Sequence, residues 1–396
     1  MVKYVEIEAK GVLQRQKYRD NWFWNRYNLN PYRGCQFACN YCDAITEKYL
    51  VHESYEDFSR IIYVKTNAPE VLRKEVKKRN RDVVAMSGVT DPYQPAEIKY
   101  ELTRKILEIL AEHEFPVHIG TKSDLVLRDI DLLREIAEQT WCTVSLTLIT
   151  FNKDLLPYLE PFAPSLERRL EAVKRLNEAG VQAGVNFTPI VPYLLDTPDN
   201  IEEVIKRASQ EHAKYILIGA GMTLRSNQRI RFLDLLKTNF PELVGKYENL
   251  YGVQESPPQD YIARLNRCAF EFCKKYRINN YIPPPSFERD SNQQTLIPTE
   301  SYERDNFEVA NFLLQMAFFK EFKSANPYSA WAYHKASNAI ENLNESIRDI
   351  YRRGKLREIP GVGDNIAKVI EDFLVTGRSE RLDKKEQEKI NYVINH

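Results

Sequence analysis

The sequence lacks an excess of charge of either sign, with 56 Lys and Arg residues against 56 Asp and Glu residues in 396 positions. A protein that coats nucleic acid by charge alone needs a basic excess, so the balance argues against that class, although a local basic face remains possible. Long apolar runs are also missing: stretches such as 215–222 fall far short of the ~20 residues that span a bilayer. Glu6 stands where a secretory signal would have its apolar core. We therefore expect a cytoplasmic protein with no membrane partner.

Cysteine is scarce as well, with six residues in the chain. Six cysteines spread over 396 residues are too few for a disulfide framework. Cys35, Cys39 and Cys42 nevertheless lie within eight residues of one another. In a reducing compartment such a tight group indicates a metal or iron–sulfur site. The other three are scattered: Cys142, Cys268 and Cys273.

The chain has no low-complexity tract, and its length suits two or three domains. Between about residues 60 and 240, short apolar runs alternate with amphipathic stretches such as 102–113 and 166–179. Strand and helix alternating at this spacing predict right-handed βαβ units and a parallel sheet. One further strand is expected before the cysteines, and 61–66 is a possible extra. The apolar runs are 82–88, 116–120, 142–148, 181–190 and 215–220.

Six such repeats suit an incomplete barrel rather than a closed eightfold one. The predicted fold class is therefore α/β, with a partial (β/α)6 TIM-like barrel followed by a small all-α domain. A polar segment at 288–303, preceded by a helix at 259–276, is expected to form a lid or connector. The expected domains are a barrel core with an N-terminal extension at 1–245, a connector or lid with helices at 246–322, and a helical domain at 323–396.

The clustered cysteines have the spacing C-x3-C-x2-C, and Tyr41 precedes the third of them. Three thiolates can hold three corners of a 4Fe–4S cube and leave the fourth iron free for a small molecule. A structural zinc site usually has four closed ligands. The fourth would have to come from Cys142, Cys268 or Cys273, and no pairing in the sequence suggests one, so zinc is the less favoured alternative.

With Tyr41 before Cys42 and βα units after it, the cysteine motif resembles that of the radical S-adenosylmethionine (SAM) superfamily. The resemblance implies a 4Fe–4S cluster on Cys35, Cys39 and Cys42, whose open iron chelates the amino and carboxylate groups of SAM. It also implies reductive cleavage of SAM to methionine and a 5′-deoxyadenosyl radical, which abstracts a hydrogen atom from the substrate. An electron donor such as ferredoxin or flavodoxin is then required.

Within that superfamily, roughly residues 25–240 resemble the spore photoproduct lyase-like branch. In that lyase a serine after the second strand and a lysine after the third contact SAM, and the matching positions here are Thr90 and Lys122. Val89 stands where the lyase has the cysteine that returns a hydrogen atom to the product radical, so the resemblance does not extend to that final step. The motifs that carry the resemblance are 30–35, 90–95 and 121–125.

Polar residues at the strand ends suit the carboxylate or the ribose of SAM. The alternative for Thr90, Ser123 and Asp124 is N-capping of the helices that follow. Arg168 and Arg169, on the helix after the fourth strand, could reach the SAM carboxylate, and the alternative is a solvated arginine face. No catalytic residue is identified. The candidate cofactor-binding residues are Tyr41, Thr90, Asp91, Lys122, Ser145 and Arg168.

The stretch 356–367, with glycines at 361 and 363 between spaced aliphatic residues, resembles a helix-hairpin-helix. Glycines let the hairpin backbone approach a phosphate, and the amides of 361–363 are expected to point outward at the start of the second helix. Such a hairpin binds the DNA backbone without reading sequence. The alternative is a glycine turn that serves packing only. The candidate DNA-binding residues are Gly361, Val362, Gly363 and Lys368.

The wider stretch 326–377 resembles the N-terminal lyase domain of family X DNA polymerases. In members with lyase activity, a lysine on the second hairpin helix forms a Schiff base with an abasic sugar. Val369 occupies that position and Lys368 lies beside it, so the resemblance implies binding rather than lyase chemistry. Some hairpins of that family hold a monovalent cation through backbone carbonyls, here those of Arg357, Ile359 and Val362. The basic run that leads into the hairpin is Arg348, Arg352, Arg353, Lys355 and Arg357.

Together these observations favour a radical SAM enzyme that acts on DNA, with repair-type chemistry on a base or lesion. Two alternatives stay open. One is an enzyme of the same cofactor class that acts on RNA or a small molecule and uses the C-terminal domain as a tether. The other is a non-enzymatic iron–sulfur protein that binds DNA.

Overall fold

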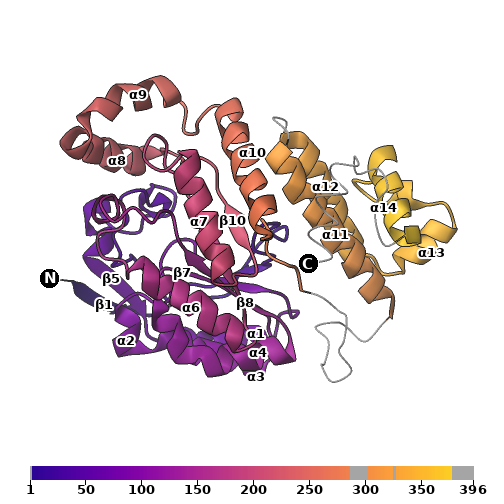
Figure 1. The fold of residues 1–396 in the computed structure, drawn as a ribbon. Coiled ribbons are helices and arrows are strands. Elements are labelled where there is room, and N and C mark those ends of the chain that lie inside the picture. The colour runs from indigo at the N-terminus through magenta and orange to yellow at the C-terminus, as the bar shows by residue number, and fades with distance from the viewer. Residues whose placement is uncertain (1, 286–300, 324–326, 377–396) are drawn as a thin grey trace. The chain divides into compact units, whose positions relative to one another are not determined.

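The computed structural model describes residues 2–285, 301–323 and 327–376, and the chain divides into two compact units (Figure 1). The first unit contains residues 1–15 and 25–283. The second contains the C-terminal part of the chain from residue 295 together with an N-terminal segment, 16–24. Most of the expected lid at 288–303 lies outside the described residues.

A seven-stranded sheet, counted over the described residues, forms the framework of the first unit, in the order β10-β9-β8-β7-β6-β3-β2. The strands from β3 to β10 pair in parallel, whereas β2 pairs antiparallel with β3 at one edge. Six parallel strands confirm the predicted partial (β/α)6 barrel. The strands are β2 (Gln14–Arg15), β3 (Tyr27–Asn28), β6 (Val84–Met86), β7 (Val117–Thr121), β8 (Cys142–Thr147), β9 (Gln182–Phe187) and β10 (Ile216–Ile218).

Amphipathic helices connect the strands, and in Figure 1 α6 and α7 lie against the sheet. The helices begin where side chains cap free amides: Ser165 accepts from the amide of Arg168, and Thr197 from that of Asn200. Their apolar faces bury residues such as Ile106 and Leu110 completely. The helices are α1 (Ala68–Val76), α2 (Ala96–Tyr100), α3 (Leu102–Glu112), α4 (Ile130–Gln139), α5 (Leu156–Leu159), α6 (Leu166–Glu178), α7 (Pro198–Gln210), α8 (Ser226–Asn239), α9 (Pro241–Tyr251) and α10 (Gln259–Tyr276).

Alternate residues of β8 have different surroundings, as expected for a strand. Cys142, Val144 and Leu146 belong to the apolar core that includes helix residues. The hydroxyls of Thr143 and Ser145 each lie 2.9 Å from the hydroxyl of Tyr215. The sheet therefore has one apolar face, packed on helices, and one face with polar side chains in the interior of the barrel.

A separate three-stranded sheet has the order β1-β5-β4, and its strand β4 directly precedes the cysteine loop in the sequence. The possible extra strand at 61–66 forms as β5, but it pairs in this sheet and not in the barrel. Because β4 ends directly before Gly34 and Cys35, its pairing with β5 anchors the start of the cysteine loop. The strands are β1 (Lys3–Ile7), β4 (Tyr32–Arg33) and β5 (Ile61–Lys65).

The regular elements of the second unit, over its described residues, are helices with no strand among them, as predicted for an all-α domain. It has an apolar core of its own, which includes Leu313, Ala336 and Ile370. The segment 16–24 belongs to the same unit, and the side chain of Arg19 donates a hydrogen bond to the side chain of Asn311 at 2.8 Å. Its helices are α11 (Ser301–Lys323), α12 (Pro327–Glu341), α13 (Ile347–Arg352) and α14 (Asp364–Thr376).

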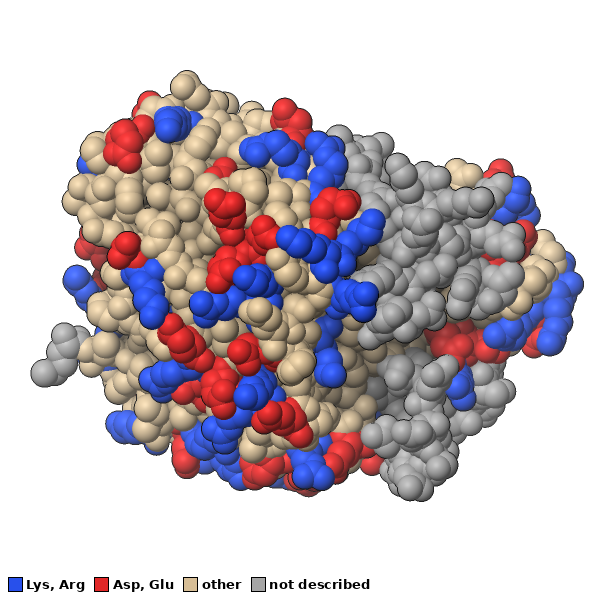
Figure 2. Space-filling model, in the orientation of Figure 1, with Lys and Arg blue, Asp and Glu red and all other residues tan. Residues whose placement is uncertain are grey.

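The residues of the expected connector, 246–322, are shared between the two units. Helix α10 packs on α7 in the first unit, and α11 packs on α12 in the second. No helix among the described residues is long and apolar enough to cross a membrane. Figure 2 shows basic and acidic side chains interspersed over one face of the first unit, in keeping with the balanced charge of the sequence.

Candidate cofactor site and nucleic-acid interface

The three clustered cysteines lie in the loop that follows β4. Gly34 opens the loop with a φ of +83°, and a Cβ there would lie 2.7 Å from the carbonyl oxygens of Phe58 and Ile61. Only glycine fits this conformation and this contact. The amide of Cys35 donates to the carbonyl of Phe58 at 3.0 Å, and the amide of Cys42 to that of Cys39 at 3.2 Å. These backbone hydrogen bonds therefore fix the path of the loop that carries the three thiols.

The three thiols are near enough to influence one another's protonation. Burial raises the pKa of Cys35, and the neighbouring Asp91, Cys39 and Cys42 raise it further. Burial also raises the pKa of Cys39, to about 12, although Lys122 opposes that rise. Metal binding would have to displace these protons, because a thiolate is the form that ligates iron.

The arrangement distinguishes between two kinds of metal centre. Among the described residues no three His, Cys, Asp or Glu side chains are grouped closely enough to hold a single metal ion. Cys142 and Cys273 are buried in the apolar core, so neither adds a fourth thiol to the loop. In an iron–sulfur cube each thiolate binds a different iron, so its ligands lie farther apart than those of one ion. The loop fits such a cluster better than it fits zinc.

Thr90 and Gln94 brace the cysteine loop from the strand end after β6. The hydroxyl of Thr90 donates to the carbonyl of Gly34 at 2.6 Å, and the side chain of Gln94 donates to the Thr90 hydroxyl at 2.9 Å. The amide of Gln36 donates back to Gln94 at 3.0 Å. Helix α2 begins later, with Pro95 at its N-cap position, so Thr90 does not cap it.

Asp91 links this strand end to the next one. Its buried carboxylate accepts from the hydroxyl of Thr121 at 2.6 Å, the amide of Lys122 at 2.8 Å and the amide of Tyr93 at 2.9 Å. Burial raises the pKa of Asp91, while these three donors lower it. Because Asp91 also acts on the pKa of Cys35, the carboxylate lies close to the cysteine loop.

A buried group of charges surrounds Cys39. Tyr41 donates a hydrogen bond to Glu160, whose carboxylate also lies 2.6 Å from the guanidinium of Arg169. The ammonium of Lys122 lies 4.0 Å from Glu160 and 5.5 Å from the centre of the Tyr41 ring. Burial alone would raise the pKa of Glu160, but Arg169 and Lys122 outweigh it and hold that pKa below its ordinary value. Two cations thus share one carboxylate beside a thiol.

The structure brings Tyr41, Asp91 and Lys122 together near the cysteines but leaves Arg168 apart. The side chain of Arg168 is 64 % exposed and pairs with Asp124 at 2.8 Å. Its neighbour Arg169, 1 % exposed, lies in the buried group instead. The buried residues of α6 recur at helical spacing, and this spacing places Arg169 on the buried face and Arg168 on the exposed face. The apolar residues of the helix could have distinguished the two arginines from the sequence alone.

Two other predicted residues have local partners. Ser145 lies in the barrel interior, where its hydroxyl contacts Tyr215 and, at 2.9 Å, the ring of His118. Ser123 caps the turn after β7 by accepting from the amide of Leu125, which matches its capping alternative. Glu160 was not identified from the sequence, because nothing in its neighbourhood separates it from a surface acid.

The hairpin in the second unit connects the 3-10 turn at Leu356–Glu358 to α14. Gly361 has a φ of +85°, and a Cβ there would lie 3.3 Å from the amide nitrogen of Ala336. Gly363 has open space around it. The prediction for Val362 is wrong in one respect: its amide donates to the carbonyl of Ile359 at 3.0 Å, and its side chain is buried, because the turn closes on itself.

Charge near the hairpin is more balanced than the basic run suggests. Lys368 is exposed on α14, whereas Val369 is buried in the domain core. Arg357 pairs with Asp364 at 2.6 Å, at the very start of α14. The other members of the run each face an acid too, in the pairs Arg348–Asp305, Arg352–Asp349, Arg353–Glu345 and Lys355–Glu358. Exposed pairs of this kind are weak and open readily to a phosphate.

Comparisons with known proteins agree with this geometry. Residues 29–208 match the family model of the radical SAM superfamily, and residues 304–379 match that of a helix-hairpin-helix domain. An uncharacterized protein of Mycobacterium tuberculosis is 32 % identical over 280 residues, which are 70 % of this chain and 81 % of that protein. An uncharacterized protein of Methanocaldococcus jannaschii is 33 % identical over 242 residues, 61 % of this chain and 85 % of that protein.

Among solved structures, the fold is similar to that of spore photoproduct lyase with bound AdoMet and dinucleoside spore photoproduct. The TM-score is 0.53 at 13 % identity, covering 74 % of this chain and 81 % of that one. At this identity the likeness shows the fold alone. The chain therefore belongs to the radical SAM superfamily, with a core whose fold is similar to that of spore photoproduct lyase and a C-terminal helix-hairpin-helix domain.

Proposed function

We propose that this protein is a radical SAM enzyme that uses a 4Fe–4S cluster and acts on DNA, with repair-type chemistry on a base or lesion. The observation that carries the proposal is the loop of Cys35, Cys39 and Cys42 beside a buried pair of cations. The helix-hairpin-helix domain of the same chain supports DNA as the substrate, since such hairpins bind the DNA backbone.

In this proposal the three cysteines hold the cluster and leave one iron open for SAM. When bound, the cluster and SAM would supply radical chemistry that begins with hydrogen-atom abstraction from the substrate. Lys122 and Arg169 present two positive charges against the single charge of Glu160. The remaining positive charge suits the carboxylate of SAM and the negative cluster thiolates. Thr90 and Asp91 hold the neighbouring loops in place, and Tyr41 holds Glu160.

The reaction differs from that of spore photoproduct lyase in its last step. Val89 stands at the position of the hydrogen-donating cysteine, and its side chain packs against the apolar cluster of Ala44, Ile45 and Phe58. A hydrophobic side chain cannot return a hydrogen atom as a thiol does. We therefore infer another hydrogen donor, or a product that needs none, and a substrate other than spore photoproduct.

The hairpin proposal rests on Gly361, Gly363 and Lys368, and Val362 is left out because its amide is closed within the turn. Of the described residues, none accepts a hydrogen bond from the amides of Gly361 and Gly363, so these two amides remain for a phosphate. Lys368 adds an exposed cation, and the carbonyls of the turn could hold a monovalent cation. Because a reduced cluster needs a reducing compartment and a donor such as ferredoxin or flavodoxin, the cytoplasm is the inferred location.

The test is DNA-dependent cleavage of SAM. The protein is purified anaerobically, reconstituted with iron and sulfide, and given SAM and dithionite with or without undamaged or ultraviolet-irradiated duplex DNA. We expect 5′-deoxyadenosine that increases with irradiated DNA and is absent in Cys39→Ala. Release that responds to RNA or to no nucleic acid would assign a different substrate, and no release would refute the enzyme proposal.

A further inference from the structure

The three-stranded sheet β1-β5-β4 separates its charged side chains by face. Successive residues of a strand point to opposite sides, and paired residues of neighbouring strands point to the same side. The registers of the sheet therefore place Lys3, Arg33 and Lys65 on one face. Glu6 lies on the other face, where it accepts a hydrogen bond from the hydroxyl of Tyr100 at 3.2 Å. The basic face, defined by Lys3, Arg33 and Lys65, thus carries cations without an acid from its own strands.

The two faces of this sheet also differ in burial. The face opposite the basic face packs into an apolar cluster of Tyr32, Ile62, Val64, Ala96 and Leu102. On the basic face Lys3 is exposed, and Arg33 and Lys65 are half-buried. His52 covers the ring of Tyr63 at the centre of the face, with ring centres 5.0 Å apart. Solvent therefore reaches the cations of the basic face, while its centre is covered.

Arg33 and Lys65 form a pair of like charges beside the cysteine loop. They are diagonal neighbours on the antiparallel strands β4 and β5, a relationship that separates residues by about 7–8 Å. The ammonium of Lys65 donates to the carbonyl of Asn30 at 2.7 Å, and in the described parts of the chain neither cation has an acidic partner. Burial and the neighbouring Arg33 lower the pKa of Lys65 to about 8. Adjacent half-buried cations are costly without a counter-charge, and an anion bound between them relieves that cost.

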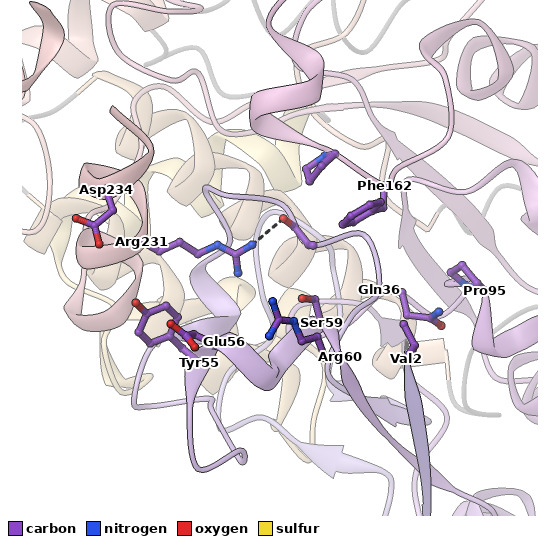
Figure 3. Close-up of a pocket in the computed structure, with 12 residues that line it drawn as sticks. Val2, Gln36, Tyr55, Glu56, Ser59, Arg60, Pro95, Phe162, Arg231 and Asp234 are labelled. Carbon is purple, nitrogen blue, oxygen red and sulfur yellow. Dashed lines mark hydrogen bonds between the residues drawn. The ribbon is translucent and has the colours of Figure 1, made fainter. Parts of the chain in front are cut away.

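A surface cavity of about 730 Å³ lies where β1 and β5 begin, and it lacks this charge pattern (Figure 3). Its lining includes the acids Glu56 and Asp234 as well as Arg60 and Arg231. Arg231 is turned toward the cysteine loop, where it donates to the carbonyl of Ala38 at 3.0 Å. Mixed charges of this kind do not select a ligand by its sign, whereas the basic face does.

We propose that the basic face binds the phosphate backbone of the DNA substrate, with one phosphate held between Arg33 and Lys65. This rests on the proposed function, because DNA is the substrate of that proposal. A guanidinium and an ammonium form charge-assisted hydrogen bonds with phosphate oxygens, and such contacts fix the position of a strand without reading its sequence. Because Arg33 precedes Cys35 by two residues, a phosphate held there lies beside the cysteine loop.

The third cation favours a nucleic-acid strand over a small anion. Lys3 is in register with Ile61, which is four residues from Lys65 on β5. At ~3.3 Å per residue, the two lysines are therefore about 13 Å apart along the strand direction. A single phosphate or carboxylate cannot contact both ends of such a row, whereas successive phosphates of one strand can. The length of the row therefore suits a polyanion.

The first experiment measures the Kd of the full chain for a fluorescein-labelled DNA duplex by anisotropy, over a range of salt concentrations. Arg33→Gln and Lys65→Gln are the variants. Arg134→Gln and Lys153→Gln are the controls, because they remove the same charge from exposed positions elsewhere in the first unit. We expect each basic-face variant to raise the Kd about fivefold at low salt and to reduce the slope of log Kd against log salt by about one, as the loss of one phosphate contact does. The controls should leave both quantities unchanged.

A second experiment uses the wild-type chain, so it does not depend on the folding of any variant. Lysines are reductively methylated with formaldehyde and a mild hydride donor, with or without the duplex, and mass spectrometry locates the modified residues. We expect DNA to reduce the methylation of Lys65 and Lys3 several-fold, because bound phosphates cover their ammonium groups. Lys153, which is 77 % exposed, should be methylated equally in both samples.

An unchanged Kd in both basic-face variants, or equal methylation of Lys65 with and without DNA, would overturn the proposal. Losses of the same size in Arg134→Gln and Lys153→Gln would overturn it too, since they would show a general effect of net charge. Tighter binding of RNA of the same sequence, with stronger protection of Lys65, would overturn it in favour of RNA. A wild-type chain that binds no DNA at low salt, and whose SAM cleavage does not respond to DNA, would instead refute the proposed function. DNA-dependent SAM cleavage therefore separates the two failures.

Discussion

The guanidinium of Arg169 lies 2.6 Å from the carboxylate of Glu160, and both side chains are almost completely buried. Lys122 approaches the same carboxylate at 4.0 Å, so the group carries one more positive charge than negative. A buried excess charge is costly unless an anion compensates for it. Asp91, which acts on the pKa of Lys122, and Cys39, whose pKa these charges influence, are the neighbours that would supply that anion, as a carboxylate and a thiolate.

Removing the central carboxylate tests this balance. Glu160→Gln would leave Arg169 and Lys122 buried without a counter-charge, and we expect the free energy of unfolding of the metal-free protein to fall by about 3 kcal/mol. Glu167→Gln is the control, since Glu167 and Lys153 form an exposed pair whose loss costs about 0.5 kcal/mol. Urea unfolding measures both. Equal decreases in the free energy of unfolding of the two variants would mean that Glu160 does not stabilise the buried charges of Arg169 and Lys122.

Iron content separates the cysteines of the loop from those of the core. Cys35→Ala, Cys39→Ala and Cys42→Ala should each abolish stable iron binding after reconstitution, because two thiolates do not hold a cube as three do. Cys142→Ala removes a thiol from the apolar core and should leave iron binding intact. Iron and sulfide analysis measures the outcome. Full iron content in Cys39→Ala, or its loss in Cys142→Ala, would contradict the assignment.

The two hairpin glycines should respond differently to alanine. Gly361→Ala forces a side chain into a left-handed conformation 3.3 Å from the backbone of Ala336, so we expect a loss of about 1–3 kcal/mol in the stability of the second unit. Gly363→Ala meets no atom within 4 Å and should leave stability nearly unchanged. It should weaken duplex binding several-fold, because the new methyl group obstructs the phosphate. Unaltered binding in Gly363→Ala would favour a hairpin that serves packing alone.

Acidification should destabilise the first unit through His118. Burial lowers the pKa of His118 from its ordinary 6.5 to about 3. The unfolded chain therefore takes up a proton below about pH 6.5 that the folded chain refuses, so stability falls as pH decreases from about 6.5 towards about 3. Between about pH 7 and about pH 5.5 the loss should be about 1 kcal/mol larger in the wild type than in His118→Gln. Identical urea midpoint shifts in the two proteins would show that His118 is protonated when folded.

Much of the barrel could be predicted from the sequence because its strands are continuous apolar runs. The runs at 116–120 and 142–148 became β7 and β8 almost residue for residue. The sequence predicts 61–66 as a possible addition to the barrel, but the pairing of the observed strand β5 with β1 depends on residues far away in sequence. Period and length identify a strand, whereas its partner is decided by tertiary packing.

The site was predicted unevenly for a similar reason. The cysteines form a local motif, so their spacing was enough to identify them. The buried role of Arg169 and the contribution of Glu160 depend on contacts between a loop and a helix, and no local pattern specifies them. The closed amide of Val362 likewise follows from the turn's own hydrogen bond, which glycine spacing does not specify.

The most direct measurement of the central claim is the EPR spectrum of the dithionite-reduced, reconstituted protein before and after addition of SAM. We predict the signal of a reduced 4Fe–4S cluster whose g values change when SAM binds the open iron, and a loss of this signal in Cys39→Ala. An unchanged spectrum at saturating SAM, or a signal that survives in Cys39→Ala, would contradict the claim that the loop of Cys35, Cys39 and Cys42 holds a SAM-binding cluster.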